Sequence, residues 1–173
     1  MDAPIDADVA RRARSPAVRF FEALGCEVPD RRAAEFFQWL EEWNVPARSG
    51  LSLRQLMKVR LTQFAESSLR MLLVDMTAAA DAFDEEWWTG VRDRAVERAR
   101  SRFLSARRIV PFLVYQRAAE PAAVAAQMGL KEADVRAYLE EVRTQVRAEA
   151  RLELETDGEP LEGMERWLES GSI

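Results

Sequence analysis

The amino-acid sequence predicts an all-α protein, and three observations support this fold class. Apolar residues recur every three or four positions through most of the chain, as they do on the buried face of a helix. No segment shows the alternation of β-branched and polar residues that is typical of a strand. The 173 residues are 48% hydrophobic, enough for one core with a small additional subdomain. We expect an N-terminal helical bundle over residues 15–88, followed by a trihelical module over residues 89–155.

The bundle is expected to begin at Ser15, after a flexible or loosely docked arm of residues 1–14. Ser15 is a favourable N-cap, and Pro16 suits the first helical position because its missing N–H costs nothing there. This helix is expected to stop at Gly25, and a second helix is expected to start at Asp30.

A long helical pattern begins at Ser52, after a loop over residues 44–50. It contains neither glycine nor proline until Gly90, and we expect a single break near Ser67 and Ser68. A stripe of leucine and methionine side chains follows one face of this pattern. The stripe is interpreted as the core of the bundle or, alternatively, as the seam of a homodimer.

Three consecutive acids, Asp84 to Glu86, stand beside two tryptophans. Consecutive residues of a helix point in different directions, so these carboxylates do not converge as a metal site requires. We interpret them as the first turn of a helix, where acids interact favourably with the helix dipole. Thr89 or Gly90 is expected to separate this segment from the next helix.

The segment from Arg92 to Arg108 is densely basic and is the strongest candidate in the chain for contacts with phosphate groups. An ordinary solvated helix face, or a docking surface for an acidic partner, is the alternative. The residues from this segment that we expect to bind nucleic acid are Arg98, Arg102, Arg107 and Arg108.

Residues 120–141 have the layout of a helix-turn-helix. Pro121 suits the first position of a short helix, and Gly129 lies where that helix must end, since the position after a helix usually requires φ > 0. A second helix is expected to begin near Lys131. A preceding helix that starts at about Ser105 would supply the third member of the module.

This pattern resembles the helix-turn-helix of bacterial sigma-factor region 4 and of related transcription regulators. The resemblance covers residues 120–141 and implies DNA binding by the second helix. That helix opens with Glu132 and Asp134, where DNA readers usually place basic or amide side chains. The residues that carry the resemblance are Ala125 in the first helix, Gly129 in the turn, and Val135 and Leu139 in the second helix.

Further along the second helix, Arg136, Arg143 and Arg147 fall on one stripe at about 100° per residue. Such a stripe can bind phosphates, and with Lys131 it completes the predicted nucleic-acid-binding set. A solvated face with ion pairs, such as Arg136 with Glu140, is the alternative.

Residues 156–173 are expected to form an acidic tail with a short amphipathic helix. From Trp88 to Leu152 the chain carries 13 basic and 8 acidic residues, whereas from Glu153 to the end it carries 1 and 7. The tail could therefore compete with nucleic acid for the basic surface, or it could be a solvated acidic segment without that role.

Composition excludes several classes of function. The chain contains no histidine and one cysteine, Cys26, so internal disulfides, the usual zinc ligand sets and His-based catalysis are excluded. Neither a glycine-rich phosphate loop nor a nucleophile with a neighbouring base is present, and we expect no enzymatic activity, no metal and no cofactor. The chain has no apolar run of about 18 residues and no apolar signal region at its N-terminus, so we expect a cytoplasmic protein without a membrane partner.

Two functional classes remain. The first is a DNA-binding helix-turn-helix protein, a bacterial or phage transcription regulator or sigma-like factor, whose N-terminal helices bind a protein partner or a second copy of the chain. The alternative is a non-enzymatic helical adaptor or phage assembly or packaging protein that uses the helix-turn-helix for packing or partner binding. The basic central block favours the first class, and the net charge of −5 favours the second. We expect DNA binding.

Overall fold

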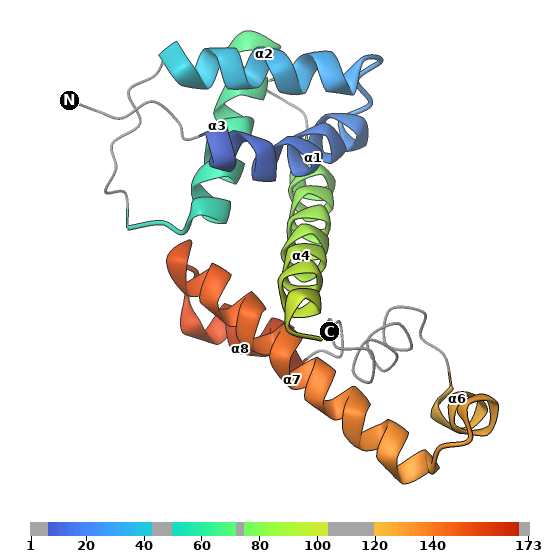
Figure 1. The fold of residues 1–173 in the computed structure, drawn as a ribbon. Coiled ribbons are helices and arrows are strands. Elements are labelled where there is room, and N and C mark those ends of the chain that lie inside the picture. Colours follow the sequence, from blue (N-terminus) through green and yellow to red (C-terminus); the bar gives the residue numbers. More distant parts are fainter. Residues whose placement is uncertain (1–6, 43–49, 72–74, 104–119, 170–173) are drawn as a thin grey trace. The chain divides into compact units, whose positions relative to one another are not determined.

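The computed structural model describes residues 7–42, 50–71, 75–103 and 120–169, and every regular element in them is helical (Figure 1). The all-α prediction is therefore confirmed for these residues. None of the described helices is long and apolar enough to cross a bilayer.

The chain forms two compact units. Unit 1 comprises Met1–Gly90 together with Asp157–Glu159, and unit 2 comprises Val91–Thr156 together with Pro160–Ile173. Unit 1 therefore joins segments that are distant in the sequence, and its three residues Asp157–Glu159 interrupt unit 2.

Unit 1 contains α1 (Ala7–Ala23), α2 (Pro29–Glu42), α3 (Leu53–Ser68) and the first part of α4 (Thr77–Arg100). Helices α1 and α2 pack against each other and run in opposite directions (Figure 1), and α2 also contacts α3. The buried faces of these helices meet in a core that is rich in phenylalanine.

Phe64 on α3 is the centre of this aromatic core. Its ring centroid lies 6.0 Å from that of Phe21, 5.8 Å from that of Phe36 and 5.6 Å from that of Trp39, all in edge-to-face geometry. These distances fall in the favourable range for aromatic pairs. The leucine and methionine stripe of α3 also turns inward, since Met57 and Leu61 are buried in unit 1. This burial supports the interpretation of the stripe as core.

Helix α1 begins before the predicted start at Ser15, so the prediction of a flexible arm is wrong for residues 7–14. Pro16 stands inside the helix, where it removes one backbone hydrogen bond. Tertiary contacts offset this cost, since Ala13 and Ala17 are buried beside it. Ser15 donates its hydroxyl to Glu86 Oε1 at 2.5 Å and does not cap the helix.

The predicted start at Ser52 and the break near Ser68 match the structure. Ser52 caps α3 through a capping box, in which its hydroxyl accepts from the Gln55 N–H and the Gln55 side chain accepts from the Ser52 N–H. Helix α3 ends at Ser68, and Arg70 follows with a left-handed φ of 57°.

Helix α4 passes through Thr89 and Gly90 without interruption, so the predicted separation at these residues is wrong. Trp87, Val91 and Ala95 are buried at intervals of four residues and form one continuous apolar face across Gly90. A single glycine costs a helix only about 1 kcal/mol, which burial of this face outweighs. The acids at 84–86 consequently lie inside α4 and not in its first turn.

Unit 2 contains the second part of α4, a 3₁₀ turn at Ser101–Phe103, α6 (Pro121–Met128), α7 (Glu132–Thr156) and α8 (Leu161–Glu169). Helix α7 contacts α6 near its beginning, and α8 folds back against its end (Figure 1). The predicted third helix of the helix-turn-helix module, from Ser105, lies outside the described residues.

Candidate nucleic-acid interface

The turn between α6 and α7 has the geometry that the sequence predicts. Pro121 opens α6 after Glu120, and Gly129 adopts the left-handed conformation at φ 65° and ψ 29°. The N–H of Leu130 donates to the carbonyl of Ala125 at 3.0 Å, which closes the end of α6. Helix α7 then begins at Glu132, one residue after Lys131.

The residues that carry the helix-turn-helix resemblance form the contact between the two helices. Val124 and Ala125 of α6 and Val135 and Leu139 of α7 make one buried cluster. Ala125 is 5% exposed, and its small side chain lets the two helix backbones approach closely. Three of the four positions that carry the resemblance, Ala125, Val135 and Leu139, therefore also form the packing contact, and the fourth, Gly129, forms the turn.

Gly129 is the position at which the turn is most sensitive to substitution. We expect Gly129→Ala to reduce the free energy of unfolding by about 1–2 kcal/mol, because a Cβ is unfavourable in the left-handed region. Gly129→Asn should cost less, since asparagine tolerates this conformation. A Cβ at Gly129 meets no heavy atom within 4 Å, so any loss reports backbone strain and not a clash. Chemical denaturation of the two variants measures the difference, and equal stabilities would contradict this account.

The exposed face of α7 carries the predicted basic stripe, partly in ion pairs. Arg136 donates to Glu132 Oε1 with its Nε at 2.8 Å, so its partner is Glu132 and not the expected Glu140. Glu140 pairs instead with Arg143. The side chain of Arg147 is exposed and has no hydrogen-bonding or carboxylate partner among the residues that the structure describes. The same is true of the Lys131 side chain.

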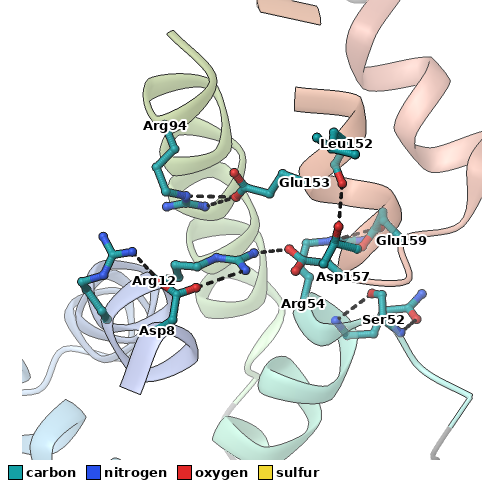
Figure 2. A network of polar contacts seen from close by, with 12 residues as sticks. Asp8, Arg12, Ser52, Arg54, Arg94, Leu152, Glu153, Asp157 and Glu159 are labelled. Carbon is teal, nitrogen blue, oxygen red and sulfur yellow. Dashed lines mark hydrogen bonds and ion pairs between the residues drawn. The ribbon is translucent and has the colours of Figure 1, made fainter. Parts of the chain in front are cut away.

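The arginines of α4 have a different environment, because they face two carboxylates of α7. Arg94 donates to Glu153 Oε1 at 2.7 Å (Figure 2), and Arg98 also pairs with Glu153. Arg102 pairs with Glu149 at 2.7 Å. Arginines therefore recur every four residues, at Arg94 and Arg98 of α4 and at Arg102 of the following 3₁₀ turn, and they match two glutamates spaced by four residues on α7.

These α4 ion pairs are harder to break than those on α7. The side chains of Glu149 and Glu153 are 7% and 6% exposed, and a buried carboxylate that loses its partner costs several kcal/mol. An exposed pair within one helix contributes only about 0.3–0.5 kcal/mol. A phosphate group can therefore displace a glutamate from Arg136 or Arg143 far more easily than from Arg98 or Arg102.

The predicted phosphate-contact residues thus divide by environment. The exposed surface of α7 carries Arg136, Arg143 and Arg147, and Lys131 is exposed just before this helix. Arg98 and Arg102 instead pair with buried glutamates of α7. Arg107 and Arg108 lie outside the described residues. One sequence signal could have revealed the intramolecular pairing: Glu149 and Glu153 occupy positions beside Ala150 and Leu154 on the apolar face of α7.

A second polar cluster lies in unit 1, where Asp157 and Glu159 meet arginines from α1 and α3 (Figure 2). Arg12 pairs with Asp157, and Arg54 donates to Glu159 Oε1 at 2.6 Å. Gly158, with φ 70°, provides the turn between the two acids. The first residues of the predicted acidic tail are therefore bound into unit 1 by two buried ion pairs.

The remaining contacts of this cluster make it charge-balanced. Arg54 also donates to Asp84 at 2.6 Å, and Lys58 donates to the other oxygen of Asp84 at 2.5 Å. The Arg54 guanidinium lies 4.9 Å from the ring centroid of Trp88, within cation–π range. Burial acts to lower the pKa of Arg54, but its hydrogen bonds to Glu159 and Asp84 raise the pKa overall. Each acid of the cluster is therefore paired with a cation, and the cluster stabilises the packing of unit 1.

Neither a metal site nor a reactive thiol emerges from the described residues. They contain no group of three or more potential metal-ligating acids or cysteines. Burial raises the pKa of the Cys26 thiol, and the nearby charge of Arg32 offsets only part of this effect. The thiol therefore remains protonated at neutral pH.

We expect Cys26 to react with iodoacetamide at pH 7 more slowly than an unperturbed exposed cysteine, because the thiolate is the reactive species. Arg32→Gln should slow the reaction further, since it removes the charge that lowers the pKa of the thiol. Mass spectrometry of timed samples measures both rates. A faster reaction in the variant would contradict this explanation.

The described residues thus build a two-helix motif with a tight glycine turn, a small apolar contact and a basic exposed face on its longer helix. The α4 arginines and the unit 1 cluster serve internal packing. Comparison of the chain with protein-family models, with curated proteins and with solved structures gave no match.

Proposed function

We propose that the α6–α7 helix-turn-helix binds double-stranded DNA. The protein would then act in the cytoplasm as a bacterial or phage transcription regulator or sigma-like factor. The observation that supports this proposal most directly is the left-handed turn at Gly129 with the buried Val124, Ala125, Val135 and Leu139 cluster, which has the layout of DNA-binding helix-turn-helix motifs.

Phosphate contacts in this proposal come from α7. The exposed surface of this helix carries Arg136, Arg143 and Arg147, and the exposed Lys131 lies just before it. Each phosphate that these side chains neutralise releases condensed counterions. The glutamates that pair with Arg136 and Arg143 are exposed and are readily exchanged for phosphate oxygens. The affinity then comes from contacts between these basic side chains and the phosphate backbone of the duplex.

One of the acids at the start of α7 has a role consistent with this proposal. The exposed Asp134 can accept a hydrogen bond from the N4 amino group of cytosine in the major groove. We therefore expect the protein to prefer DNA sites with a cytosine opposite Asp134.

Fluorescence anisotropy with a mixed double-stranded DNA pool over a salt series tests the proposal. We expect wild-type affinity to fall steeply with salt, and Arg136→Ala/Arg143→Ala to make the slope of log K against log salt shallower by about 2. Arg19→Ala/Arg31→Ala removes two exposed charges from unit 1 and is the matched control. Absence of wild-type binding at low salt would refute DNA binding.

A second prediction from the same assay concerns the α4 arginines. Glu149→Gln/Glu153→Gln should strengthen DNA binding and steepen the salt slope, because it releases Arg94, Arg98 and Arg102 from their carboxylates. An unchanged slope would mean that these arginines stay unavailable to phosphate.

One observation favours the alternative of an adaptor or phage assembly protein. Met128 and Leu130, at the α6–α7 turn, are 41% and 42% exposed, and Tyr138 on α7 is 39% exposed. Exposed apolar side chains are typical of protein-binding surfaces where they form a patch. Analytical ultracentrifugation provides the test. No DNA binding, combined with self-association that Leu130→Ser/Tyr138→Ser abolishes, would favour this alternative.

A further inference from the structure

A groove lies between the exposed face of α7 and the end of α8, both in unit 2. It has a volume of about 540 Å³, and its described lining consists of Thr144, Arg147, Ala148, Arg151 and Leu168. This volume falls in the range of about 300–1,000 Å³ that is typical of small-molecule sites.

Two arginines without partners face this groove. Arg147 and Arg151 are exposed, and neither has a hydrogen-bonding or carboxylate partner among the described residues. They are separated by four positions on one helix, so their like charges lie close together and repel each other. The other two arginines of α7, Arg136 and Arg143, have glutamate partners within the helix. A bound anion would relieve the repulsion between Arg147 and Arg151.

Two acids of α8 whose side chains are described do not neutralise these charges. Glu162 pairs with Arg166 of its own helix at 2.9 Å, and Glu165 is exposed without a cationic partner among the described residues.

The rest of the lining defines the ligand more closely. Thr144 supplies a hydroxyl on the same face as the two guanidinium groups, and Ala148 and Leu168 supply an apolar wall. Leu168 is itself buried at 6% exposure, which holds this wall in place. Two guanidinium groups match the double negative charge of a phosphomonoester, whereas a carboxylate would balance only one of them.

We infer that this groove binds a small organic phosphate, with the phosphomonoester dianion held by Arg147 and Arg151 and its apolar group against Ala148 and Leu168. Thr144 donates its hydroxyl to a phosphate oxygen. This site shares Arg147 with the proposed DNA-binding surface but does not depend on that function, and its test uses neither DNA nor the Arg136 and Arg143 variants of that test.

Titration of the full chain with phenyl phosphate, followed by isothermal calorimetry and by NMR of the arginine Nε–H groups, tests the inference. We expect saturable binding that shifts the signals of Arg147 and Arg151. Arg147→Gln or Arg151→Gln should each weaken binding roughly tenfold, as expected for the loss of a charged hydrogen bond. Arg166→Gln, an exposed arginine on α8 that is paired with Glu162, is the matched control and should bind as wild type does.

Two companion ligands separate charge from apolar recognition. Inorganic phosphate has the charge alone, and benzoate has an aromatic ring with a single negative charge, so both should bind more weakly than phenyl phosphate. Absence of phenyl phosphate binding at millimolar concentration, or unchanged binding in Arg147→Gln/Arg151→Gln, would overturn the inference. Equal binding of inorganic phosphate and phenyl phosphate would overturn the assignment of the apolar wall.

Discussion

Replacement of Phe64 by alanine is expected to reduce the free energy of unfolding by about 3–5 kcal/mol, the usual range for a phenylalanine deleted from a packed core. Phe64 is 3% exposed, and its ring contacts those of Phe21, Phe36 and Trp39, which come from α1 and α2. The truncation leaves a cavity among three rigid rings that cannot easily collapse to fill it.

Urea denaturation followed by circular dichroism measures this loss. Val59→Ala, at an exposed position of the same helix, is the control and should change stability by no more than about 0.5 kcal/mol. Phe64→Leu should recover part of the lost stability because it refills much of the volume. A loss for Phe64→Ala no larger than that for Val59→Ala would show that the aromatic core does not hold these three helices together.

Replacement of Arg54 by methionine is expected to cost about 3–5 kcal/mol, because it leaves a buried carboxylate without its cation. Glu159 is 1% exposed on its side chain, and Arg54 donates to it with two nitrogens. The substitution also removes a cation from Asp84 and the cation–π contact with Trp88. Desolvation of the stranded Glu159 is the largest part of the expected loss.

A double-mutant cycle separates this desolvation from simple loss of packing. Arg54→Met/Glu159→Gln should be more stable than Arg54→Met alone, since the stranded charge is gone. Arg31→Met removes an arginine that is exposed and paired with Glu35 on α2, and it should cost less than about 1 kcal/mol. If the two Arg54 variants are equally unstable, the buried charge is not the cause.

Local chemistry was sufficient to predict the bihelical motif. Gly129 is required where the chain must adopt φ > 0, and the spacing of Val135 and Leu139 determines which face of α7 meets α6. The Ser52 capping box is equally local, because all its partners lie within three residues. Such features depend on neighbours in the sequence, and a sequence therefore displays them directly.

The predictions that failed did so where distant residues outweighed a local signal. Ser15 and Pro16 are a good helix start, yet α1 extends back to Ala7 because it packs in unit 1. Gly90 is a good helix end, yet α4 continues because its apolar face is buried on both sides of it. In both cases a local preference of about 1–3 kcal/mol is smaller than the free energy of burial.

The all-α class and the turn at Gly129 could be predicted from the sequence, because helical periodicity and backbone preference are local properties. Which charged side chains can bind a ligand depends on long-range packing. Arg98 and Arg102 pair with Glu149 and Glu153, and Asp157 and Glu159 pair with Arg12 and Arg54, whereas Arg147 and Arg151 have no carboxylate partner among the described residues. The physical reason is that the free energy of an ion pair depends on burial and on partners many residues away, and a count of charges along the chain contains neither.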